Sequence, residues 1–182
     1  MRRTTRLAVS LTTLALAGAA ATVAPPVGAA PSGGGCSLSG TAKFAGGPNS
    51  AAHAFTYTFS GTLSSCQSNP SGPASGTIAT LVPAKGGGTC ALGNTSGTAL
   101  VTWADKSTTI IDYTTQSTGP AVQLQGRVLP SFKVKKKVYK TTRDKGDNAF
   151  GYLAFQASPV ECAGSGVTSA GISGIAGLNS NS

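Results

Sequence analysis

The sequence predicts an all-β fold, an antiparallel β-sandwich of Ig-like size with seven or eight strands. Short runs of alternating apolar and polar residues recur along the chain, turn-forming residues separate them, and no convincing helical pattern is present. Several of the intervening connections are longer than ten residues, which favours a sandwich, because a meandering barrel prefers tight connections. A small β-barrel is the alternative architecture for the same strands.

The clearest hairpin runs from Gly97 to Tyr113, with a turn at residues 104–107. Trp103, the only tryptophan, ends the first strand and Tyr113 ends the second, so an aromatic ring at each end can fix the register. Alternation places three residues of each strand on one face: Ala99, Val101 and Trp103, then Thr109, Ile111 and Tyr113.

An earlier hairpin pairs residues 36–44 with residues 55–63, and alternation directs Phe55, Tyr57 and Phe59 inward. The tripeptide Ser-Gly-Thr recurs at residues 39–41, 60–62, 75–77 and 96–98, in most cases with its glycine among the inward positions. A glycine inside a strand marks a bend or close packing by a bulky neighbour. We therefore expect strands that coil around a narrow core.

Further strands are predicted at residues 76–82, 121–129, 148–156 and 166–175, and residues 83–96 are predicted to form a loop. All of these belong to a single domain over residues 36–176, because a chain of this length provides one core rather than two. Residues 31–35 form a flexible lead-in, and residues 177–182 a frayed tail.

Residues 1–30 have the pattern of an export signal. Three arginines precede an apolar run, and small residues up to Ala30 follow it. A retained membrane anchor is the alternative, but cleavage after Ala30 fits better and leaves no membrane span. The protein is therefore expected to be secreted and extracellular, with association to the cell envelope as a further option.

The four cysteines all lie beyond the predicted cleavage site, which indicates two disulfides in an exported chain. Three connectivities are possible. Cys36 opens one strand and Cys66 lies just beyond its antiparallel neighbour, so the pairs Cys36 with Cys66 and Cys90 with Cys162 are favoured. No two cysteines have the close spacing of a zinc site, and no metal is expected.

A basic stretch near residue 140 is the most distinctive polar feature and contains seven of the eleven basic residues left after cleavage. On a single strand it would form a basic ribbon that attracts a polyanion, such as an anionic cell-wall polymer, without specific recognition of nucleic acid. Alternatively, these lysines protect an exposed edge strand from aggregation, which is the favoured interpretation. The residues are Lys133, Lys135, Lys136, Lys137, Lys140, Arg143 and Lys145.

Evidence for catalysis is thin, and neither a catalytic residue nor a cofactor is predicted. His53, the only histidine, lies in a loop, and no G-x-S-x-G motif is present. The carboxylates do not form an obvious glycosidase pair, and Asp144 with Asp147 departs from the spacing of a calcium loop. The inward aromatic residues could line a ligand pocket, but in a domain of this size they are more often core.

The Ala/Thr-rich export signal, the repeated Ser-Gly-Thr strands, the TWADKST turn at residues 102–108 and the four dispersed cysteines resemble the small exported two-disulfide β-domain proteins of high-GC Gram-positive bacteria. The resemblance covers most of the mature chain and implies no particular activity. We therefore expect a non-enzymatic exported domain that acts by binding, with the basic ribbon as its candidate binding surface. A small extracellular hydrolase, a protease inhibitor or a small-ligand carrier are the alternatives, and the oligomeric state stays open.

Overall fold

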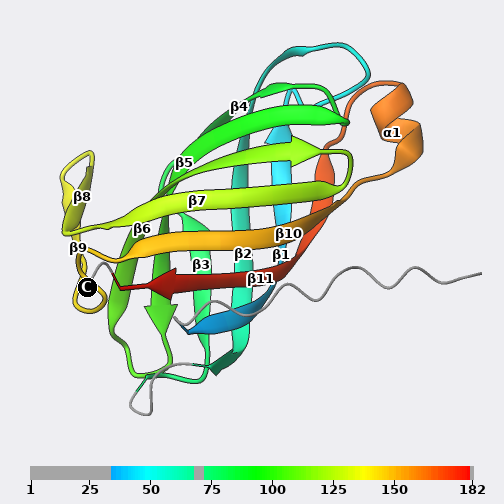
Figure 1. The fold of residues 1–182 in the computed structure, drawn as a ribbon. Helices are drawn as coiled ribbons and strands as arrows, with labels where there is room; N and C mark the ends of the chain where they lie inside the picture. Colours follow the sequence, from blue (N-terminus) through cyan, green and yellow to red (C-terminus); the bar gives the residue numbers. More distant parts are fainter. Residues whose placement is uncertain (1–33, 68–71, 181–182) are drawn as a thin grey trace, which may run out of the picture.

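A computed structural model describes residues 34–67 and 72–180 (Figure 1). The predicted export signal and parts of the predicted lead-in and tail lie outside these residues. Strands predominate, which confirms the all-β prediction. They are β1 (Gly35–Ala45), β2 (His53–Gln67), β3 (Gly76–Thr80), β4 (Ala84–Gly88), β5 (Leu92–Trp103), β6 (Thr108–Thr118), β7 (Ala121–Leu129), β8 (Ser131–Val134), β9 (Lys137–Lys140), β10 (Asn148–Gln156) and β11 (Ser169–Asn179).

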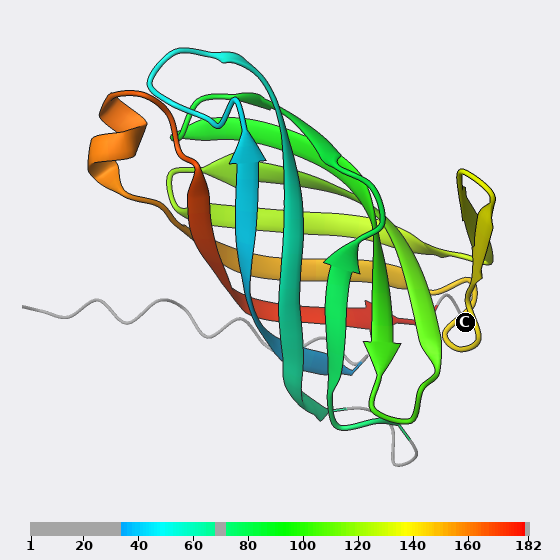
Figure 2. The ribbon, with the colours of Figure 1, turned by 180° about the vertical axis from the view of Figure 1, so that it is seen from behind.

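The main sheet closes on itself, because β1 pairs with both β2 and β11. Every pairing is antiparallel, and β3 and β4 together fill one position between β2 and β5. In the described part of the chain the result is an eight-position barrel whose strands follow one another in sequence order. Figures 1 and 2 show its wall from opposite sides. The small-barrel alternative is thus confirmed, in place of two facing sheets.

The long connections lie at the ends of the barrel or outside it, which is why they did not prevent closure. Residues 46–52 and 157–168 lie at one end, and a two-stranded sheet of β8 and β9 branches off at the other (Figure 1). The prediction of a loop over residues 83–96 was wrong, since these residues include β4 and the start of β5. β11 also continues through Asn179, beyond the predicted end of the domain.

Each end of the barrel carries one disulfide. Cys36 in β1 is bonded to Cys66 in β2, and Cys90, between β4 and β5, is bonded to Cys162 in the short helix α1 (Pro159–Ala163). Both favoured pairings are confirmed. The helix itself was not predicted, and no helix within residues 34–67 and 72–180 is both long and apolar enough to cross a membrane.

Aromatic rings pack closely against glycines of the same or the neighbouring strand. A Cβ on Gly40 would lie 2.6 Å from the Phe59 ring, and one on Gly97 would lie 2.8 Å from the Tyr113 hydroxyl oxygen. This confirms that the recurring glycines mark close packing by bulky neighbours. The pairs are Gly40 and Gly61 with Phe59, Gly76 with Trp103, Gly86 with Phe55, and Gly97 with Tyr113.

Replacing Gly97 by alanine should therefore destabilise the protein by about 1–3 kcal/mol, because the new methyl group would also lie 2.7 Å from the Cβ of Ala84. The control is Gly87→Ala, whose Cβ would approach no atom closer than 3.8 Å and should change stability by less than about 0.5 kcal/mol. Urea unfolding of both variants measures the difference. Equal losses of stability would show that Gly97 is not held by its contacts.

The His53 side chain contacts backbone carbonyl groups of the connection between β1 and β2. Its Nδ1 lies 2.8 Å from the carbonyl oxygen of Ala51, and its Nε2 lies 3.1 Å and 3.0 Å from those of Gly46 and Gly47. Carbonyl oxygens only accept hydrogen bonds, so the ring satisfies both sides when both nitrogens are protonated. The bond to Ala51 is the main reason that the pKa of His53 is raised above 6.5, and the bonds to Gly46 and Gly47 add to it.

Because its pKa is raised in the folded state, His53 should stabilise the protein fully below pH 6.5 and lose that effect as the pH rises through the folded-state pKa. We expect His53→Gln to lower the melting temperature at about pH 5 and to have a smaller effect at about pH 8. Thermal unfolding of both proteins across this range provides the measurement. If the difference in melting temperature between the two proteins grew with pH, it would contradict the stabilising role of protonated His53.

Candidate functional site

The interior of the barrel contains a cavity of about 910 Å³, lined mainly by apolar side chains. An eight-stranded barrel is wide enough either to be filled by its own side chains or to hold one small ligand. Phe59, Leu124, Leu153 and Ile172 line this cavity and are only partly buried. The interior is therefore incompletely filled, and its volume lies within the range of about 300–1,000 Å³ typical of small-molecule sites.

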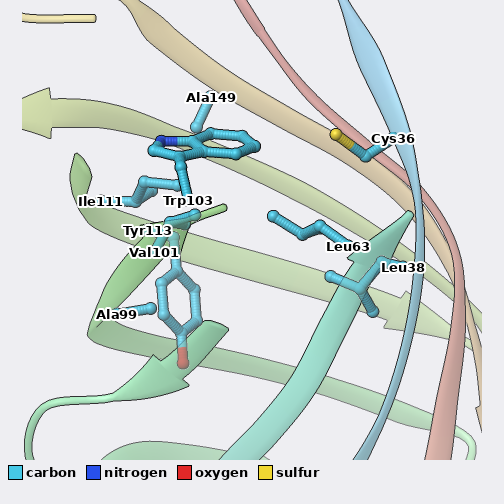
Figure 3. Close-up of a cluster of buried hydrophobic side chains, with 9 residues drawn as sticks. All are labelled: Cys36, Leu38, Leu63, Ala99, Val101, Trp103, Ile111, Tyr113 and Ala149. Carbon is cyan, nitrogen blue, oxygen red and sulfur yellow. The ribbon is translucent and has the colours of Figure 1, made fainter. Parts of the chain in front are cut away.

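Figure 3 shows a cluster of buried apolar side chains that forms part of the cavity wall. Trp103 and Tyr113 lie on one side of the interior, and Leu38 and Leu63 face them from β1 and β2. The residues drawn all belong to one buried cluster, and all of them line the cavity. Of the aromatic residues interpreted from the sequence as core, Phe55, Tyr57, Trp103 and Tyr113 are buried and Phe59 is partly buried, and all five also line the cavity.

Trp103 is held in place by hydrogen bonds at one end of the barrel. Its Nε1 donates to Oγ1 of Thr109 at 2.8 Å, and that hydroxyl donates in turn to a carboxylate oxygen of Asp144 at 3.0 Å. Thr109 is completely buried. Because the indole N–H already has a partner, Trp103 presents apolar ring surface to the cavity.

The same end carries the charged residues of the lining, Arg143, Asp144 and Asp147. Arg143 is neutralised by two carboxylates, with nitrogen–oxygen distances of 3.1 Å to Asp105 and 3.3 Å to Asp144. Hydrogen bonds from Ser107, followed by the Arg143 charge, lower the pKa of Asp105. Burial, and then the neighbouring Asp144, raise the pKa of Asp147. This end of the cavity therefore has no excess positive charge.

Four hydroxyl groups form a hydrogen-bonded chain in the lining nearer the other end. The Tyr57 hydroxyl lies 2.9 Å from those of both Tyr113 and Thr95, and the Thr95 hydroxyl lies 2.7 Å from that of Thr115. All four residues line the cavity. Burial is the main cause that raises the pKa of both tyrosines, so they stay neutral and keep their protons at physiological pH.

The predicted basic ribbon is a hairpin rather than a single strand. Lys135 has a positive φ of 52° and lies in the turn between β8 and β9, so the chain reverses within the lysine run. Lys133 pairs with Val138, while Phe132 pairs with Tyr139. Phe132 and Tyr139 are partly buried and Val138 is exposed, so Lys133 lies on the side facing solvent. Turn geometry, which strand alternation does not reveal, overrode the predicted faces.

Most of the basic candidates are exposed on this hairpin, and they are Lys133, Lys135, Lys136, Lys137 and Lys140. Lys137 lies over the Tyr139 ring, with its Nζ 4.5 Å from the ring centre. Lys145 is exposed on the following loop. Arg143 differs from the other candidates because its guanidinium is occupied by the two carboxylates described above.

The remaining candidates for catalysis do not come together. His53 lies in the β1–β2 connection with both ring nitrogens against backbone carbonyls, and Asp112 faces Arg127 at 3.9 Å. Asp105 and Asp144 are linked by Arg143, which forms an ion pair with each of them. Among residues 34–67 and 72–180, no group of three or more His, Cys, Asp or Glu side chains is placed to hold a metal ion.

Sequence reasoning considered a ligand pocket but favoured a filled core, and it missed the hydroxyl chain. A signal for the pocket was present, because glycines and aromatic residues share the inward faces of several strands. Thr95 and Thr115 could not be recognised in the same way, since Thr95 was assigned to a loop and threonine is abundant in this chain.

Comparisons of the chain with models of protein families, with curated proteins and with solved structures found no match.

Proposed function

We propose that this protein is a non-enzymatic carrier that binds one small, largely apolar molecule inside its barrel. The observation that supports this most directly is the cavity of about 910 Å³, lined by Trp103, Tyr113 and the aliphatic residues opposite them. An apolar molecule that enters such a space leaves water, which contributes about 25 cal/mol for each Å² of apolar surface buried.

The wall around the cavity is suited to keep its shape. Its backbone groups are paired around the full circumference, and a disulfide joins neighbouring elements at each end. A site that exists before the ligand arrives loses less conformational entropy on binding. The carrier alternative is therefore better supported than the hydrolase, for which His53 has no nucleophile among its hydrogen-bond partners.

We also propose that the domain works outside the cytoplasm. The two disulfides support this, because such bonds persist in oxidising compartments. The export pattern of residues 1–30 points to the same compartment.

Trp103 provides the test of binding, since it is the only tryptophan and lines the cavity. The purified protein should bind the apolar dye N-phenylnaphthylamine, and energy transfer from Trp103 to the dye should report it. Ala176→Phe, which adds a ring to the lining, should weaken dye binding by about tenfold, whereas Ser39→Phe on the outer face of the adjacent strand should not. A dye that binds neither the wild type nor Ser39→Phe would refute the carrier function.

A second candidate function is attachment to an anionic polymer of the cell envelope through the β8–β9 hairpin. Five exposed lysines on this short projection support it, because concentrated positive charge attracts polyanions. Edge protection also fits the hairpin, since each of its strands has an unpaired side.

Sedimentation with isolated cell envelope separates these two roles. At low salt, replacing Lys135, Lys136 and Lys137 by glutamine should abolish retention that high salt also disrupts. Replacing Lys43, Lys85 and Lys106 by glutamine removes the same charge elsewhere on the surface and should leave most retention intact. Equal losses from both triple variants would show a general charge effect, and no retention of the wild type would favour edge protection.

A further inference from the structure

The hydroxyl chain of Tyr113, Tyr57, Thr95 and Thr115 always has one proton more than it has hydrogen bonds. Four hydroxyls carry four protons, and three contacts of 2.9, 2.9 and 2.7 Å join them. Within the described residues these side chains make no other hydrogen bond. For either direction of donation along the hydroxyl chain, one O–H group has no acceptor within that chain and can donate to another group.

That spare proton lies in the lining of the cavity, where a donor needs an acceptor. Tyr57 and Tyr113 are 9% and 7% exposed, Thr95 and Thr115 are partly buried, and all four side chains line the cavity. A buried donor without a partner costs about 1–3 kcal/mol, and unpaired donors are rarer than carbonyl oxygens with a spare lone pair. A bound molecule that offers an acceptor at this point removes that cost.

The charges of the lining argue against an anionic ligand. Arg143 is the one basic side chain among the described lining residues, and Asp105 and Asp144 already neutralise it. At the hydroxyl chain the described lining offers a carboxylate or phosphate no basic partner, because Arg143 lies at the other end of the cavity. Burying an unpaired anion is costly, so the acceptor on the ligand should be uncharged.

The shape of the site favours an elongated molecule. Thr95 and Trp103 lie at opposite parts of β5, separated by about 26 Å along the strand at 3.3 Å per residue, and both line the cavity. An apolar chain can therefore extend from the hydroxyl chain toward the Trp103 ring.

Resting on the carrier function proposed above, we propose that the preferred ligand is a neutral, elongated apolar molecule whose polar group is a hydrogen-bond acceptor, such as a ketone or ester carbonyl. The hydroxyl chain of Tyr57, Thr95, Tyr113 and Thr115 binds that acceptor. The apolar part lies against the residues of Figure 3.

Displacement of N-phenylnaphthylamine by three probes of equal chain length tests the proposal: octyl methyl ketone, decanoate and decylammonium. On the wild-type protein the ketone should displace half of the dye at a concentration about tenfold lower than that needed for either ion. The variant Tyr57→Phe, Thr95→Val, Tyr113→Phe, Thr115→Val should lose most of this preference, measured as the ratio of the ketone and decanoate concentrations that displace half of the bound dye. Thr56→Val with Thr114→Val removes exposed hydroxyls from β2 and β6 and should retain it.

An infrared spectrum of the bound ketone gives a second readout that does not depend on the folding of the fourfold variant. The carbonyl band should lie below its position in hexane, because accepting a hydrogen bond weakens the C=O bond. An unshifted band, or equal displacement by ketone and decanoate, would overturn this proposal while leaving the carrier function in place. A wild-type protein that binds no dye and none of the three probes would overturn both.

Discussion

Pairing of the first and last strands is the constraint on which the rest of the structure depends. β1 is hydrogen-bonded along most of its length to β11 on one side and to β2 on the other. This double pairing removes the open edges of the main sheet and turns one face of every strand toward a shared interior. Without it, the inward aromatic residues would face water and no enclosed site would exist.

Glycine and aromatic residues together explain why the interior is hollow. A glycine adds no side chain to the interior, and it lets a neighbouring ring pack close to the wall. Phe59 lies over Gly40 and Gly61, and Tyr113 lies beside Gly97 in a neighbouring strand. The position of Tyr113 also lets its hydroxyl reach Tyr57, so the same packing creates both the space and its polar group.

The exposed lysines of the β8–β9 hairpin and the apolar lining of the cavity lie in separate parts of the molecule. The exposed lysines concentrate on a hairpin outside the barrel wall, while the cavity lining is apolar and hydroxylic apart from the residues around Arg143. The two activities proposed above, attachment to a polyanion and uptake of a neutral molecule, would therefore use different surfaces. Substitutions on the hairpin and substitutions in the cavity lining test them separately.

The sequence by itself determined the class of fold and most strand positions, and it favoured the disulfide pairing that the structure shows. Residues 121–129 and 148–156 were predicted as strands with the bounds that the structure shows, because alternation depends only on neighbouring residues. The pairing of Cys36 with Cys66 followed from their places at one end of a hairpin. Inward placement of Trp103 and Tyr113 was predictable for the same local reason.

Only the tertiary structure decided between sandwich and barrel, and between a filled core and a cavity. Closure depends on contact between β1 and β11, which are far apart in sequence, and alternation within a strand carries no record of that contact. The reversal at Lys135 split the expected basic ribbon, because paired residues such as Val134 and Lys137 share a face of the hairpin, whereas alternation along one strand assigns them to opposite faces. Likewise, Thr95 and Thr115 became functional candidates only through their neighbours across the barrel, since a hydroxyl acquires its role from the groups it meets in space.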